Sequence, residues 1–113
     1  MFDLGDTENM WYSADLFFES VHDNFPKDTD LWEEQVLLIN ANSEEEARAT
    51  AEELGRRNEH VYTSGTGDNV HWVFRMVASV DEILDENLKS GTEVFSRFLR
   101  AAEVKALLTP FEE

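Results

Sequence analysis

Two arginines are the first candidates for chemistry in this sequence. Arg75 and Arg97 are cations within otherwise apolar stretches, in a chain that carries only nine Lys and Arg residues. Guanidinium groups hold carboxylates and phosphates through paired hydrogen bonds. Together with His71, they predict a pocket on a sheet face for a small anionic ligand or for an enzymatic reaction. The simpler alternative is that each arginine forms a structural ion pair, for example with Glu33 or Glu34.

The three histidines, His22, His60 and His71, do not have the spacing of metal ligands on a helix. A two-residue turn at Gly65-Thr66 would place His60 directly opposite His71 across a hairpin, close enough to share a metal ion. Zinc needs three or four ligands, however, and the sequence fixes no third one. We therefore expect no metal site and no cofactor.

No catalytic motif accompanies these residues. The sequence has no cysteine, no G-x-S-x-G or H-E-x-x-H pattern, and no phosphate-binding loop beyond the fragment Gly65-Thr66-Gly67. Ser96 lies beside Arg97, but no His or Lys base is placed near it by spacing. The sequence therefore assigns no catalytic residue. It leaves open whether the protein is an enzyme and favours a non-catalytic role.

Aromatic and acidic residues predict contact with another protein. Trp11, Trp32 and Trp72 lie in predicted strands or at their edges, where tryptophans commonly anchor a core or an interface. Residues 1–34 contain ten carboxylates and one Lys. Such a bias is typical of a solvated surface, or of a surface that attracts a basic partner. We expect a basic protein to bind the tryptophan side or this acidic third of the chain.

Composition limits the class of protein. A chain of 113 residues with 42% hydrophobic residues suits one domain with a packed core. A formal net charge of −16 disfavours nucleic acid as a partner, because the phosphates would be repelled. We find no apolar run long enough for a membrane span and no signal-peptide pattern. We therefore expect a cytoplasmic protein with no membrane contact.

The pattern of apolar residues predicts the elements that would position these side chains. Alternating or continuous apolar runs predict five strands, at residues 11–21, 31–41, 60–63, 69–77 and 92–99. Two S-x-x-E capping boxes and a run ended by Pro110 predict three helices, at residues 43–57, 79–88 and 101–108. We expect a disordered or frayed segment at residues 1–10 and a single α+β domain at residues 11–113. The domain would be one antiparallel sheet of about five strands, with the helix at 43–57 on one face.

One main helix is too narrow to cover both faces of such a sheet. A monomer rarely exposes a contiguous apolar patch beyond a few hundred Å². Either the two short helices or a second copy of the chain must therefore cover the second face, and we favour a homodimer.

Four segments resemble a family of small bacterial proteins, the domain of unknown function 4288 family. They are WYSADLFFES, WEEQVLLINANSEEEARATAEELGRR, VHWVFRMVASVDEIL and GTEVFSRFLRAAEV. The likeness spans Trp11 to about Leu108 and is most specific in the stretch GTEVFSRFLR. The resemblance implies an α+β domain in a cytosolic bacterial context, and it brings no catalytic residues. Three hypotheses remain: an interaction module for a basic partner, an anionic-ligand or enzymatic site at Arg75 and Arg97, and a structural homodimer.

Overall fold

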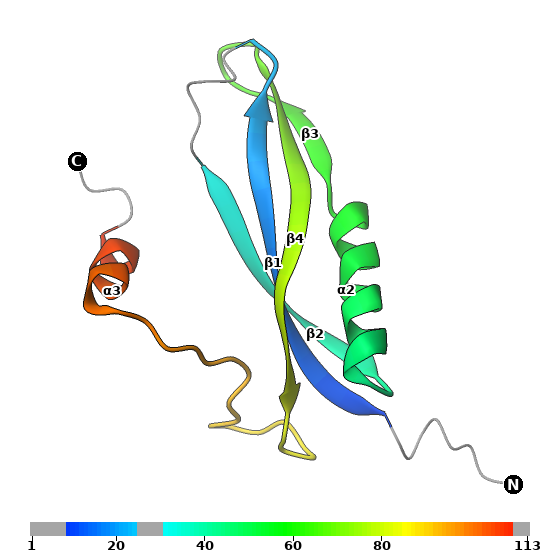
Figure 1. Ribbon diagram of the computed structural model, residues 1–113. Coiled ribbons are helices and arrows are strands. Elements are labelled where there is room, and N and C mark those ends of the chain that lie inside the picture. Colours follow the sequence, from blue (N-terminus) through cyan, green and yellow to red (C-terminus); the bar gives the residue numbers. More distant parts are fainter. Residues whose placement is uncertain (1–8, 25–30, 110–113) are drawn as a thin grey trace, which may run out of the picture.

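The protein is an α+β domain built on one four-stranded antiparallel sheet (Figure 1), which confirms the predicted fold class. The computed structural model describes residues 9–24 and 31–109. The strand order is β2-β1-β4-β3, and α2 covers one face of the sheet. The strands are β1 (Met10–His22), β2 (Trp32–Ala41), β3 (His60–Thr63) and β4 (Asn69–Ile83). The helices are α2 (Glu44–Arg57) and α3 (Ala101–Leu108).

The core lies between the sheet and α2. Alternate residues of the central strand β1 point toward the helix and are almost completely buried: Tyr12, Ala14, Leu16 and Phe18. The helix contributes Ala47 and Ala51, both fully buried. These small side chains let the helix axis lie close to the sheet, so that burial of the large β1 side chains stabilises the fold.

The predicted start of α2 is confirmed. The Ser43 side chain accepts a hydrogen bond from the Glu46 backbone N–H at 3.1 Å. The Glu46 carboxylate accepts from the backbone N–H of Asn42, one residue earlier than the capping-box prediction. Together these bonds satisfy donors that would otherwise lack partners at the helix N-terminus.

Two elements predicted in the C-terminal third are wrong. Residues 79–83 are the end of β4, where they pair with β1, and they do not begin a helix. Residues 92–99 form no strand, so the sheet has four strands among the described residues instead of about five. The long partner strand β1 outweighs the local capping signal at Ser79, because each paired residue satisfies backbone groups on both strands. Of the segment expected to be frayed, residues 1–8 lie outside the described residues, and Met10 already belongs to β1.

The register of the β3–β4 hairpin also differs from the prediction by one residue. His60 pairs with Trp72 and Val61 pairs with His71, across a loop in which Gly67 has a φ of 88°. The predicted His60–His71 pair is therefore wrong. The two imidazoles lie on opposite faces of the sheet, because neighbouring positions in a strand alternate.

Within residues 9–24 and 31–109, no helix packs on the face of the sheet opposite α2. The chain leaves β4 at Ile83, turns at Thr92, where the hydroxyl donates to Asp85 at 3.1 Å, and passes back over this face. We call residues 84–109 the C-terminal arm. The arm ends in α3, which contacts no other helix or strand among the described elements. Figure 1 shows α3 on the opposite side of the sheet from α2 and separated from it.

Candidate functional site

The sheet face opposite α2, which the arm covers only in part, is an apolar surface framed by carboxylates. Strand alternation and pairing direct six exposed apolar side chains to it, and we call this surface the open face. They are Trp11, Trp32, Val36, Leu38, Val61 and Met76. Leu38 and Met76 are each 48% exposed, and Val36 is 46% exposed. Because soluble monomers rarely leave a contiguous patch of this kind in water, the open face is the strongest candidate for a binding surface.

Two of the three tryptophans predicted for an interface lie on the open face. Trp11 is near the start of β1, and Trp32 pairs with Glu19 toward the other end of that strand. Trp11 and Glu19 are eight positions apart along β1, which is about 27 Å at the rise of a strand. Trp72 is on the helix face instead, where it stacks against His60 and packs on the core. The three tryptophans therefore do not form one surface.

Beneath the arm, the open face contains buried polar groups. Ser13 is 1% exposed and Asp15 is 3% exposed, and neither the Ser13 hydroxyl oxygen nor the Asp15 Oδ1 atom has a hydrogen-bond partner. Burial raises the pKa of Asp15 to about 7, and a hydrogen bond and like charge from Glu34 act in the same direction. Arg97 of the arm opposes this shift, and its guanidinium lies 3.7 Å from the Glu34 carboxylate. The arm therefore brings a cation to an acidic pair in the sheet.

Each residue of the predicted anionic-ligand site has a carboxylate partner. The Arg75 Nε atom donates to Glu19 at 2.9 Å, and His71 Nε2 lies 2.9 Å from Asp23. Arg97 contacts Glu34, in agreement with the ion-pair alternative for that residue. The pairing of β4 with β1 skips Arg75, which makes it the extra residue of a β-bulge and turns its side chain toward Glu19. A ligand site at Arg75, Arg97 and His71 stays a prediction. An anion that binds there would have to compete with three carboxylates for these side chains.

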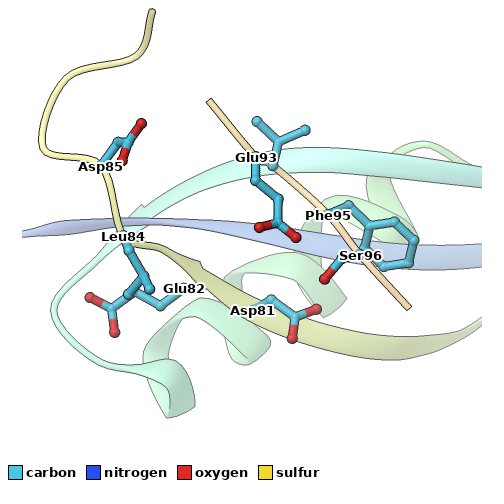
Figure 2. A pocket seen from close by; sticks show the side chains of 8 residues that line it. Asp81, Glu82, Leu84, Asp85, Glu93, Phe95 and Ser96 are labelled. Atoms are coloured by element: carbon cyan, nitrogen blue, oxygen red, sulfur yellow. The ribbon is translucent and has the colours of Figure 1, made fainter. Parts of the chain in front are cut away.

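A cavity of about 380 Å³ lies where the arm crosses the end of β4 (Figure 2). Its lining includes four carboxylates and no Lys, Arg or His: Asp81, Glu82, Asp85 and Glu93. Figure 2 shows the arm, with Glu93, Phe95 and Ser96, lying across the strands at this point. The negative potential of these groups disfavours an anion. Among the described residues, no group of three or more His, Asp or Glu side chains is arranged to hold a metal ion.

A second buried carboxylate, Asp68, was missed by the sequence-based reasoning. It accepts hydrogen bonds from the backbone and side-chain nitrogens of Asn24 and lies 3.0 Å from His22 Nδ1. Burial alone would raise the pKa of Asp68, but the bonds from Asn24 and His22 lower it below its ordinary value. Asp68 thus ties the end of β1 to the β3–β4 loop and has a structural role. The acidic residue at the end of a Gly-rich loop was the signal that could have indicated it.

Comparison with known proteins gives a family but no activity. The family model described as Domain of unknown function (DUF4288) matches residues 11–96, and the chain belongs to this family. The match covers the sheet, α2 and the first part of the arm, and ends before Arg97. No curated protein and no solved structure matches the chain. No helix of the described residues is long and apolar enough to cross a membrane.

Proposed function

We propose that this protein is a non-catalytic protein-interaction domain and that the open face is its binding surface. The proposal is supported mainly by the distribution of the exposed apolar side chains over the molecule. The described residues include sixteen large apolar side chains that are exposed; six form the open face and eight lie in the C-terminal arm. A solvated surface with no partner would not concentrate them in this way, because apolar area in water is unfavourable.

Charge supports a partner of basic character. Glu19, Glu34 and Asp81 project from the same face as the apolar side chains, within a chain of net charge −16. Complementary potentials steer partners toward such a surface and select against acidic ones. The partner chemistry that fits is therefore a segment with apolar residues flanked by Lys or Arg.

The same contacts favour a non-catalytic role. Among the residues that sequence analysis singled out, the two arginines and His71 each face a carboxylate. A catalytic base or an anion-binding arginine must be able to reach a substrate. The proposal therefore assigns no catalytic residue.

A titration with two synthetic peptides tests the proposal. One labelled peptide alternates Leu and Lys, and a second of equal length alternates Leu and Glu. Fluorescence anisotropy with dilute protein should show binding of the Leu–Lys peptide, with an affinity that falls as salt concentration rises. The double variant Val36→Asn, Leu38→Asn should weaken this binding about tenfold, because it removes two exposed apolar side chains of the open face.

Tyr62→Asn is the matched control. Tyr62 is as exposed as Leu38, at 48%, but it pairs with the buried Val70 and therefore lies on the other face of the sheet. Its replacement should leave the affinity for the Leu–Lys peptide unchanged. Equal binding of the two peptides, or equal loss in Tyr62→Asn and in the double variant, would contradict the proposal.

A further inference from the structure

We infer that the segment bound to the open face is the C-terminal arm of a second copy of the chain, exchanged reciprocally in a homodimer. This inference rests on the proposed function and names its partner. It joins two surfaces that a single chain leaves uncovered: the open face and the last part of the arm, residues 98–109, which we call the distal arm.

The helix of the distal arm, α3, makes no contact with the strands of its own chain among the described elements. Among the described residues, Arg97 is the last arm residue with an ion pair to the sheet, and the hydrogen bonds beyond it are local, such as that from Thr109 to Lys105. Phe98 is fully exposed, and no residue of α3 is buried. The radius of gyration, 17.7 Å, exceeds the value of about 13 Å for a compact domain of this length, because the long strands β1 and β4 and the arm all extend the molecule.

The sequence of α3 is typical of a helix that buries one apolar side against another part of a protein. Its eight residues, AAEVKALL, place Val104, Leu107 and Leu108 on one side, at the i, i+3 and i+4 spacing of an apolar stripe. A helix this short is marginal in water by itself, because nucleation costs more than a few hydrogen bonds return. A surface that buries this stripe would therefore stabilise α3.

The open face fits that stripe in size. α3 is about 12 Å long at the rise of a helix. The apolar residues of β2 from Trp32 to Leu38 extend over about 20 Å, and the partner strands add Met76. The distal arm and the open face together supply roughly twenty residues from each copy, which is the size of one side of a standard protein interface.

Charge favours the distal arm, rather than the sheet face, of the second copy as the segment that covers the open face. The distal arm carries two cations, Arg100 and Lys105, against one carboxylate, Glu103. The rest of the chain is strongly acidic, so a second sheet face would repel the open face, whereas the arm is complementary to it. Since each chain has one arm and one open face, a two-fold dimer satisfies both with no third component.

The absence of cysteine from the chain allows a direct test by cross-linking. Full-length copies carrying Val36→Cys and one tag are co-expressed with full-length copies carrying Leu107→Cys and another tag, and a short bis-maleimide is added. We expect a covalent product of twice the 13.0 kDa chain mass that contains both tags. In the control, Tyr62→Cys on the helix face is used in place of Val36→Cys. The yield of the cross-linked product should then fall at least severalfold.

The double variant Val36→Cys, Leu107→Cys in one chain decides between exchange and folding back. Exchange predicts interchain products; a cross-link confined to one chain, at 13.0 kDa, would overturn the inference. The Leu–Lys peptide titration, repeated on the same protein, shows whether an intrachain cross-link overturns only the dimer or also the proposed function. Peptide binding at Val36 and Leu38 together with an intrachain cross-link would leave the proposed function standing and remove the second copy.

Discussion

Asp15 is the residue whose surroundings differ most from those of a free carboxyl. It lies at the centre of the sheet, 3% exposed, and faces Glu34 from β2, Asp81 from β4 and Arg97 from the arm. Burial and the two carboxylates raise its pKa to about 7, against the partial compensation by Arg97. A folded chain therefore holds a proton on Asp15 over a pH range in which the unfolded chain has released it.

This shift predicts a pH-dependent stability. Because the folded pKa of Asp15 is raised from 3.8 to about 7, the free energy of unfolding should fall as pH rises between these values and level off above pH 7. Asp15→Asn cannot ionise, so at pH 8 it should be more stable than the native chain by on the order of 2 kcal/mol, with a smaller difference near pH 4. Urea unfolding followed by circular dichroism at several pH values measures this.

Glu86→Gln is the control for that prediction. Glu86 is an exposed carboxylate of the arm that does not contribute to the pKa of Asp15, so its replacement should change stability by less than about 0.5 kcal/mol. A native chain whose stability is flat from pH 4 to 8, or an Asp15→Asn variant that is less stable at pH 8, would refute the assignment.

The sequence predicted part of this residue-scale picture. The ion-pair alternative for the two arginines anticipated the contact of Arg97 with Glu34. The burial of Asp15 was not predictable, because it results from arm residues about eighty positions later in the chain. The Arg75–Glu19 pair depends on a bulge, and a single extra residue leaves no pattern in the sequence.

At the scale of elements, the contact of α2 with β4 depends on a glycine. A Cβ atom built on Gly55 would lie 2.5 Å from the ring of Phe74, closer than side chains in proteins approach. The ring of Phe74 is itself fixed by Phe18, with ring centroids 5.7 Å apart, so it cannot move freely. The last turn of α2 can therefore lie on the sheet only with glycine at this position.

Gly55→Ala should consequently destabilise the fold. Alanine favours a helix by about 1 kcal/mol over glycine, but the clash with Phe74 should cost more, giving a net loss of about 1–2 kcal/mol. Thermal unfolding measures the difference. Gly65→Ala is the matched control, because no atom lies within 4 Å of its added Cβ and its φ is not positive. A Gly55→Ala variant as stable as the native chain would show that Phe74 can yield.

Local signals explain which elements could be predicted. The Ser43 cap and the small residues of α2 specify that helix within a single segment. Ser79 with Glu82 forms an equally good capping box, yet these residues extend β4, because their partners in β1 lie more than sixty residues away. The hairpin register was predicted wrongly for a related reason. A hydrogen bond from Ser64 to Asp68 closes a loop of three residues, one more than the predicted two-residue turn.

At the scale of the whole molecule, one chain leaves exposed both the apolar side chains of the open face and those of the distal arm. The narrow width of one helix already predicted an exposed second sheet face, and the structure has that face. The missing fifth strand was not predictable as an arm. The alternation of apolar and polar residues in TEVFSRFL is typical of a strand. Only the structure shows that this segment does not pair with either edge strand of the sheet.

The most direct test of this account is the molar mass of three full-length proteins by light scattering at matched concentration. The native chain should have twice the 13.0 kDa mass of one copy, and Val104→Asp, Leu107→Asp should have the mass of one copy. Ala102→Asp, Ala106→Asp adds the same charge to the opposite side of α3 and should remain a dimer. A native chain of 13.0 kDa at the highest soluble concentration, or equal dissociation of both variants, would show that the distal arm does not cover the open face of a second copy.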